Sequence, residues 1–274
     1  MPYGKRPRKN SAWRVIGATV GQFRRASGMS QQRLADEVNL SLDQIASIEQ
    51  GRRPLGLRLA RQLDQLLRTS QTLEVAVAEV PQAERYPLFA QDYMEEEPLA
   101  LSLMSYETQV VPGLLQIEEY AKAVFKEQYQ PLSPDDVDQR LADRLTRQAI
   151  FQREPSPPLM TYIIEESILR RPMGGPEAMR RQIRRLREVA QLPHVILQIM
   201  PLDRVEHASL AGPIVLLETP AHEHLAYFEV HDVSSLIDDP DDVSVLQQRY
   251  GMLRSQALTP EESMRLMDDL LGDQ

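Results

Sequence analysis

Cysteine is absent from this chain of 274 residues, tryptophan occurs once, and no long apolar run is present. Without thiols, a disulfide framework, a zinc–thiolate site and a cysteine nucleophile are excluded, and this composition suits a reducing cytoplasm. No stretch approaches the roughly 20 apolar residues of a membrane span. The N-terminus is basic but no apolar segment follows it, so we expect no secretory signal. These absences predict a soluble, cytoplasmic protein that does not enter a membrane.

Charge divides the chain into two parts. Residues 1–70 carry 13 Lys and Arg against 5 Asp and Glu, a net of +8, whereas the remainder carries 18 against 35, a net of −17. The length allows two domains with separate cores, and no internal repeat is visible. Because phosphates attract basic segments and repel acidic ones, we expect the N-terminal part to bind nucleic acid and the acidic part to serve another purpose.

Residues 31–51 have the spacing of two short helices joined by a tight turn. Ala35 is small where the two helices would touch, and Asn39 stands where the chain must adopt a left-handed conformation. Ser41 is a good N-cap for the second helix, and Gln44 would complete a capping box with it. The apolar and terminal positions also fit a helix pair: Leu34, Val38, Ile45, Ile48 and Gly51. This pattern is typical of a DNA-binding helix-turn-helix.

Two amphipathic helices flank this pair and would complete an all-helical domain over residues 1–70. The upstream helix covers residues 13–26, and the downstream helix carries Leu55, Leu59, Leu63, Leu66 and Leu67. Helix pairs with short turns also occur in proteins that never touch DNA, but the joint fit of all the constrained positions favours DNA binding. The polar–apolar alternation of residues 69–80 is compatible with helix or strand until Pro81 interrupts it, and we assign residues 71–83 to a linker.

Residues 84–274 are predicted to form a second, α+β domain. Helical patterns cover residues 84–109, 114–130, 135–152, 176–191 and 241–257. Short β-rich runs, separated by Pro, Gly or acidic residues, cover 159–164, 194–200, 213–218 and 225–230. The chain is therefore expected to be multi-domain, with an all-α N-terminal domain followed by a mixed domain.

Several motifs of the second domain carry a family resemblance. They are Val111-Pro112-Gly113-Leu114-Leu115-Gln116, Glu118-Glu119-Tyr120-Ala121, Arg144 with Arg147-Gln148, Glu165-Glu166-Ser167-Ile168-Leu169-Arg170, Gly174-Gly175 before Met179, Gln182 and Leu186, then Pro201 and Gly212. With the helix-turn-helix, they make the chain resemble the Xre-type regulators of actinobacteria, which join a lambda-repressor-like domain to an antitoxin-like domain of unknown function. Asn39, where that family usually has Gly, and the scarcity of tryptophan are departures.

The resemblance implies a DNA-binding transcriptional regulator that acts as a pair with a small BldB-like protein encoded beside it. It implies no catalytic activity. An alternative stays open for the second domain, namely a pocket for a small-molecule effector that changes the spacing of the DNA-binding heads. The acidic charge of this domain would suit a partner with a basic docking face.

The second helix of a helix-turn-helix presents its N-terminal residues to base edges in the major groove. In this chain those residues are Ser41, Leu42, Asp43, Gln44 and Ser47. Gln44 has the groups to pair with adenine, Asp43 to accept from cytosine, and Leu42 to touch a thymine methyl group. For Gln44 the alternative is a purely structural role in the capping box.

Phosphate contacts are expected from Gln31, Arg33, Arg52 and Arg53, which flank the two helices. The wider basic footprint adds Lys5, Arg6, Arg8, Lys9, Arg24 and Arg25. The arm at residues 5–9 would either enter the minor groove or remain a solvated tail. We expect a homodimer on a palindrome of double-stranded DNA, since one such domain reads few base pairs. Candidate dimer contacts, with core packing as the alternative, are Leu63, Leu66, Leu67, Leu73, Val75 and Val77.

Catalysis by the acidic domain is weighed on two groups of residues. Glu165 and Glu166 are adjacent, so on a strand they point to opposite faces and do not make a facing acid–base pair. His222 and His224 follow Thr219-Pro220 in an expected hairpin loop, near Glu223, His231 and Asp232, without a third ligand at fixed spacing. Gly174-Gly175 lacks the Lys and Ser or Thr of a phosphate-binding loop and is expected to be a turn. We expect no catalytic residue, metal site or cofactor.

Overall fold

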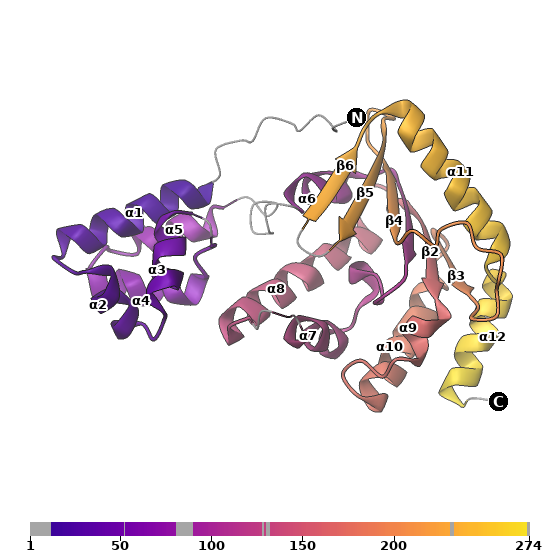
Figure 1. Cartoon of the computed structure of the whole chain (residues 1–274), viewed down its shortest axis with the longest axis horizontal. Coiled ribbons are helices and arrows are strands. Elements are labelled where there is room, and N and C mark those ends of the chain that lie inside the picture. The colour runs from indigo at the N-terminus through magenta and orange to yellow at the C-terminus, as the bar shows by residue number, and fades with distance from the viewer. Residues whose placement is uncertain are drawn as a thin grey trace. The chain divides into compact units, whose positions relative to one another are not determined.

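The structure, a computed structural model, describes residues 12–51, 53–80, 90–127, 129, 132–230 and 233–272. It divides into two compact units, Met1–Gln91 and Asp92–Gln274. Figure 1 shows helices alone in the first unit and a sheet with surrounding helices in the second. The prediction of an all-α N-terminal domain followed by an α+β domain is therefore confirmed.

The first unit contains α1 (Ala12–Ala26), α2 (Gln31–Glu37), α3 (Leu42–Glu49), α4 (Leu57–Leu67) and α5 (Thr72–Ala78). Its core is built by the apolar residues that the helical spacing selected, including Ile16, Val20, Leu34, Ile45, Ile48, Leu55 and Leu63. Helices α1 and α3 approach closely at Gly17, where an added Cβ would lie 2.1 Å from the Ile48 carbonyl oxygen. Only glycine fits this crossing without moving the helices.

Helix α5 corrects the expected linker at residues 71–83. Leu73 and Val77 are buried in the same core as α1 to α4, so residues 72–78 belong to the first unit. The buried Asp64 carboxylate of α4 accepts hydrogen bonds from the backbone N–H groups of Leu73 (3.0 Å) and Glu74 (2.8 Å) and from the Thr69 hydroxyl. This side chain supplies the acceptors that the N-terminus of α5 lacks locally. Residues 81–89, including Pro81, lie outside the described part of the chain.

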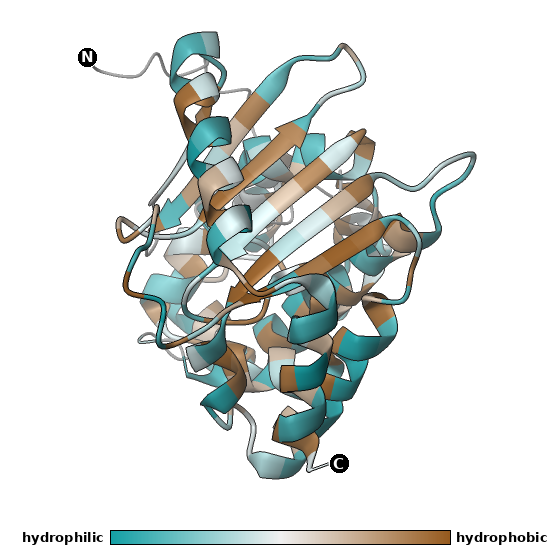
Figure 2. Ribbon diagram, turned by 90° about the vertical axis from the view of Figure 1, so that its right-hand side faces the viewer, coloured by the Kyte–Doolittle hydropathy of each residue, from teal (hydrophilic) through white to brown (hydrophobic). Residues whose placement is uncertain are grey.

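The second unit is organised by a six-stranded sheet in the order β3-β2-β1-β4-β5-β6. The strands are β1 (Ser102–Glu107), β2 (Leu159–Glu165), β3 (Val195–Met200), β4 (Ile214–Glu218), β5 (His224–Val230) and β6 (Val233–Ile237). Strands β1, β2 and β3 are parallel to one another, whereas β4 runs antiparallel to β1 and the following neighbours alternate. Figure 2 shows apolar residues concentrated along these strands.

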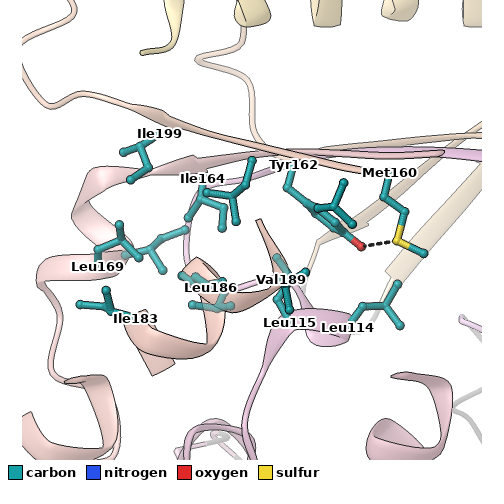
Figure 3. Close-up of a cluster of buried hydrophobic side chains, with 14 of the residues drawn as sticks. Leu114, Leu115, Met160, Tyr162, Ile164, Leu169, Ile183, Leu186, Val189 and Ile199 are labelled. Atoms are coloured by element: carbon teal, nitrogen blue, oxygen red, sulfur yellow. Dashed lines mark hydrogen bonds between the residues drawn. The ribbon is translucent and has the colours of Figure 1, made fainter. Parts of the chain in front are cut away.

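Helices and short 3-10 turns surround the sheet. They are α6 (Gln91–Glu96), η2 (Glu97–Leu99), η3 (Gly113–Leu115), α7 (Glu118–Lys126), α8 (Pro134–Arg147), η4 (Gln148–Gln152), α9 (Glu166–Arg170), α10 (Pro176–Val189), α11 (Pro240–Gln256) and α12 (Pro260–Leu271). On one face, side chains of η3, α10 and α12 pack on β1, β2 and β3, and Figure 3 shows part of this core. On the other face α11 covers β1 to β5 through Val243, Leu246, Tyr250 and Leu253.

The predicted strands at 159–164, 194–200, 213–218 and 225–230 are confirmed as β2 to β5, and the helix at 176–191 as α10. The predicted helix at 84–109 is wrong, because residues 102–107 form β1 at the centre of the sheet. The polar residues of β1 break the apolar run by which the other strands were predicted. Its Ser102 hydroxyl bonds to Glu218 and its Tyr106 hydroxyl to Glu165, so pairing partners far along the chain satisfy them. Strand β6 and helix α12 were not predicted.

The motif at residues 111–116 is a loop held by an internal hydrogen-bond network. The buried Gln116 amide donates to the Val111 carbonyl (2.7 Å) and accepts from Arg144 (2.7 Å). Gln148 donates to the Gln116 carbonyl, and the fully buried Gln182 joins this loop to α10 through the backbone of Leu115 and Ile117. These motif residues therefore satisfy buried backbone groups, which gives them a structural role.

Candidate nucleic-acid interface

The turn between α2 and α3 has the conformation that the sequence predicted. Asn39 has a φ of 54°, and the Leu40 N–H donates to the Ala35 carbonyl at 2.9 Å, which closes the chain tightly after α2. Ala35, Ile45 and Ile48 are buried where the two helices meet. Among residues with a side chain, Asn tolerates this left-handed region best. The turn fixes the angle at which α3 leaves α2.

The capping box at the start of α3 is confirmed. The Ser41 hydroxyl accepts from the Gln44 N–H at 3.2 Å, and the Gln44 amide oxygen accepts from the Ser41 N–H at 2.9 Å. The cap therefore uses the amide oxygen of Gln44 and holds this side chain against the first turn. The oxygen still has a second lone pair, and the amide nitrogen is not part of the cap.

The predicted base-reading residues lie along one side of α3. Ser41, Leu42 and Asp43 are exposed, and Leu42 keeps 43% of its surface although it is a large apolar residue. Gln44 and Ser47 are half-buried, while Ile45 and Ile48 on the opposite side belong to the core. The first two turns of α3 therefore offer an apolar contact, a carboxylate, an amide and hydroxyls to an external partner.

The predicted phosphate contacts have different surroundings. Arg33 is exposed in the first turn of α2, and Arg53 is half-buried with its backbone N–H donating to the Ser47 carbonyl at 3.2 Å. The Gln31 amide donates to Glu49 at 2.8 Å, so one of its amide protons is already engaged in a hydrogen bond within the first unit. Arg52 and the arm at residues 5–9 lie outside the described residues. Arg58, which was not among the predicted phosphate contacts, is exposed in the first turn of α4.

Arg24 corrects the predicted basic footprint, because it is not available to phosphates. Its guanidinium group makes two bonds to the Glu49 carboxylate, Nε to Oε1 at 2.5 Å and an NH2 to Oε2 at 3.0 Å, and a third to the Met29 carbonyl. Both side chains are about nine-tenths buried. Charge alone does not distinguish a buried ion pair from an exposed phosphate contact.

The same network determines the ionisation of Glu49. Burial by itself would raise the pKa of this carboxyl group, but hydrogen bonds from Arg24 and Gln31 outweigh burial and hold the pKa below its ordinary value. Arg24 follows Phe23 on α1, Gln31 begins α2, and Glu49 ends α3. The network therefore ties the N-terminus of α2 and the C-terminus of α3 to α1.

The predicted dimer contacts are mostly core residues. Leu63, Leu67, Leu73 and Val77 are buried, and Leu66 packs against the same cluster. These leucines follow the helical spacing because they fill the interior of the first unit. Only Val75 of α5, with 56% of its surface exposed, remains on the outside among these candidates.

The acidic candidates of the second unit do not form a facing carboxylate pair. Glu165 accepts from the Tyr106 hydroxyl (2.7 Å) and contacts His207 (2.9 Å), whereas Glu166 accepts from the Leu202 N–H (3.0 Å) and pairs with Arg170. The two carboxylates therefore have separate hydrogen-bond partners.

The histidines after Thr219 lie at the turn between β4 and β5. His222 is exposed and contacts Glu218 at 2.7 Å, and His224 opposes Glu218 across the two strands. His231 and Asp232 lie outside the described residues. Within the described ranges, no group of three or more His, Asp or Glu side chains is placed to hold a metal ion.

Another pair of carboxyl groups lies on the face of the sheet opposite Tyr106. Burial raises the pKa of Glu107 to about 7, the charge of Glu229 adds to the rise, and a hydrogen bond from the Ser105 hydroxyl opposes it. Glu229 accepts from the Tyr227 hydroxyl at 2.8 Å, and the Tyr227 ring stacks on Tyr93 with centroids 4.4 Å apart. Glu107 and Glu229 were not among the predicted acidic candidates, because no pattern in the sequence indicates that β1 and β5 belong to the same sheet.

Two family models match the chain. The model described as "Helix-turn-helix domain" matches residues 15–76, which span α1 to most of α5. The model described as "Domain of unknown function (DUF5753)" matches residues 90–269. No curated protein and no solved structure matches the chain. None of the helices in the described ranges is both long and apolar enough to cross a membrane.

Proposed function

Because the chain belongs to the family described as "Domain of unknown function (DUF5753)" and joins this domain to a helix-turn-helix, we propose that it is a sequence-specific, Xre-type transcriptional repressor. The helix-turn-helix domain assigns it to the DNA-binding regulators. Repression is the simplest mode of action, since a bound protein blocks polymerase by occupying the promoter. Support comes chiefly from the start of α3, where a capping box fixes the first turn and Leu42 and Asp43 are exposed.

We assign base reading to Ser41, Leu42, Asp43, Gln44 and Ser47. In a major groove, Leu42 would contact a thymine methyl group, Asp43 would accept from cytosine, and Gln44 would pair with adenine, each contact contributing about 1–3 kcal/mol of discrimination. Arg33, Arg52 and Arg53 would hold phosphates. Gln31 would add its remaining amide proton or its backbone N–H, because Glu49 already engages its side chain.

The base-reading assignment is tested by selection of preferred DNA sequences from a random pool, with the wild type and two Gln44 variants. Gln44→Glu keeps an acceptor for the Ser41 N–H and so preserves the capping box. Its carboxylate accepts from cytosine, whereas the amide of Gln44 pairs with adenine. Gln44→Ala removes both functions. We expect Gln44→Glu to alter one position of the selected site without loss of stability.

Gln32→Ala serves as the matched control, because Gln32 is an exposed glutamine of α2 that bonds to Asp36 within its own helix. If both Gln44 variants select the wild-type site, Gln44 is a capping residue only. If all four proteins select no common sequence, the assignment of sequence-specific binding fails.

We further propose that the protein binds DNA as a homodimer on a palindrome and that the second unit controls this binding through a small protein partner. The partner would be a BldB-like protein encoded nearby, as the resemblance to antitoxin-like regulators implies. Co-purification of the two proteins after co-expression, in a fixed ratio, is the expected result. Sedimentation as a monomer at micromolar concentration, with one protomer per DNA site, would remove the homodimer.

An alternative function for the second unit is favoured by the Glu107 and Glu229 cluster. Polar groups at a sheet face suit a small-molecule effector. An effector that binds the native state must raise the melting temperature, so a metabolite that does so, together with no co-purified partner, would favour this alternative.

A further inference from the structure

The segment at residues 201–213 follows β3 and lies at the carboxyl ends of β1 and β2. The two acidic candidates hold it in place, because Glu166 accepts from the Leu202 N–H at its start and Glu165 contacts His207 at its middle. The Gln256 amide of α11 accepts from the Ala208 N–H at 2.9 Å. The segment also carries large apolar side chains in solvent, namely Leu202, Val205 and Leu210.

His207 is bonded through both of its ring nitrogens, Nε2 to residues of the sheet and Nδ1 to the backbone of the segment itself. Nε2 lies 2.9 Å from Glu165 Oε1 and 3.0 Å from the Tyr106 hydroxyl, and Nδ1 accepts from the Ser209 N–H at 3.1 Å. The imidazole is largely buried, with 8% of its side-chain surface exposed. A ring nitrogen that accepts a hydrogen bond carries no proton, so this geometry requires the neutral tautomer with its proton on Nε2.

A second proton on His207 would act on the two sides of the ring differently. The contact of Nε2 with the Glu165 carboxylate would persist and gain charge, because Nε2 is a donor in both states. Nδ1 would change from acceptor to donor and would face the Ser209 N–H, donor against donor. The ring would therefore stay on Glu165 while the backbone at Ser209 loses its partner.

The charged groups on the elements packed against the segment do not replace that acceptor. Glu165 and Tyr106 face Nε2, Glu166 is occupied by Leu202 and Arg170, and α11 presents the neutral Gln256 to Ala208. The charged residues of the segment itself are exposed to solvent: Asp203, Arg204 and Glu206. Arg204 is within electrostatic range of Glu262 on α12. Within the described part of the chain, the acceptor of the Ser209 N–H is Nδ1 of His207.

We propose that residues 201–213 form a proton-sensitive strap, which neutral His207 holds closed and which a second proton on the imidazole opens around Ser209 and Leu210. Among the side chains, histidine is the one that ordinarily gains a proton between pH 5 and 8, and the test below therefore compares two pH values in this range. Opening would change the position of the exposed apolar side chain of Leu210, while the sheet and Glu165 remain in place.

The test measures hydrogen exchange of the Ser209 backbone amide in the full chain at pH 7.5 and pH 5.5, with each rate divided by that of an unstructured peptide at the same pH. Imidazole nitrogen shifts report the tautomer in the same samples. We expect the Nε2-protonated tautomer at pH 7.5. On acidification, protection of Ser209 should fall about tenfold, which is the upper range for loss of one hydrogen bond.

Two variants divide the functions of the ring. In His207→Asn the side-chain oxygen occupies the place of Nδ1, so Ser209 should stay protected at both pH values. In His207→Gln the amide reaches Glu165 but leaves Ser209 without an acceptor, so protection should be low at both. His222→Gln removes an exposed histidine of the same unit and should behave as the wild type.

Equal protection of Ser209 at both pH values in the wild type would overturn the proposal. So would a proton on Nδ1 at pH 7.5. Both results come from the wild-type chain, so they decide the matter even where a variant fails to fold.

Discussion

The buried pair of Arg24 and Glu49 yields the sharpest prediction about the DNA-binding unit. Removal of one partner leaves the other charge buried without compensation, and this costs about 3–5 kcal/mol in buried pairs. The side chains keep 10% and 9% of their surface, and the remaining partner can still reach some water. We therefore expect Glu49→Ala and Arg24→Ala each to lower the free energy of unfolding by roughly 3 kcal/mol, the lower end of that range.

The double variant Arg24→Met with Glu49→Leu separates the cost of an unpaired charge from the net contribution of the pair. Both charges are removed and apolar volume is retained, a change that is often neutral or stabilising. We expect the double variant to lie within about 1 kcal/mol of the wild type, far from the sum of the single losses. The exposed pair of Arg61 and Glu74 is the control, and Arg61→Ala should cost less than about 1 kcal/mol.

Unfolding of the first unit is followed by fluorescence, because the single tryptophan of the chain, Trp13, lies in its core. Urea titrations then report this unit separately from the second. The reasoning is refuted if Glu49→Ala costs less than the Arg61→Ala control, or if the double variant loses as much as both single variants together.

Three further changes follow from single contacts. Asp64→Ala removes the acceptors of the Leu73 and Glu74 N–H groups. It should lower the free energy of unfolding, followed by Trp13 fluorescence, by about 2 kcal/mol, the upper range for an N-cap. No loss would show that α5 does not need this cap. Gly17→Ala places a Cβ 2.1 Å from the Ile48 carbonyl oxygen. It should lower the free energy of unfolding by about 3 kcal/mol and weaken DNA binding. An unchanged urea midpoint would contradict the close crossing of α1 and α3. Glu107 has a raised pKa of about 7, so its contribution to stability is complete below the ordinary carboxyl range and is lost as the pH rises through 7. Unfolding free energies measured from pH 4.5 to 8 should therefore fall less steeply in Glu107→Gln than in the wild type, and parallel profiles would exclude the raised pKa.

Local signals in the sequence were sufficient for the helix-turn-helix and for β2 to β5. The positions of Ala35, Asn39 and Ser41 are set by contacts within a few residues, and the runs of Val, Ile and Leu in the strands are dense. The structure confirms the turn, the capping box and these strands. Short-range patterns predict those features because short-range contacts determine them.

Features that depend on distant partners were missed. Strand β1 contains two serines and a glutamate, and its pairing with β2 and β4 becomes visible only in three dimensions. In the sequence, Arg24 cannot be distinguished from the exposed arginines, because its burial depends on the ion pair with Glu49. Residues 72–78 likewise cannot be distinguished from a linker, because the cap of α5 comes from Asp64 on another helix. Helix α12 had a local signal, since Thr259 and Glu262 form a capping box with Pro260 at its start. That signal was sufficient to predict it.

The central claim is that the first unit recognises a specific DNA sequence and that the second unit regulates this activity through a protein partner. Genome-wide mapping of DNA bound by the native protein, with and without the neighbouring small gene, tests both parts in one measurement. We expect sharp peaks over an inverted repeat near the protein's own promoter, and we expect these peaks to change when the neighbouring gene is deleted. Sharp peaks that do not respond to the deletion would contradict partner control, and diffuse binding with no shared sequence in either strain would contradict specific recognition.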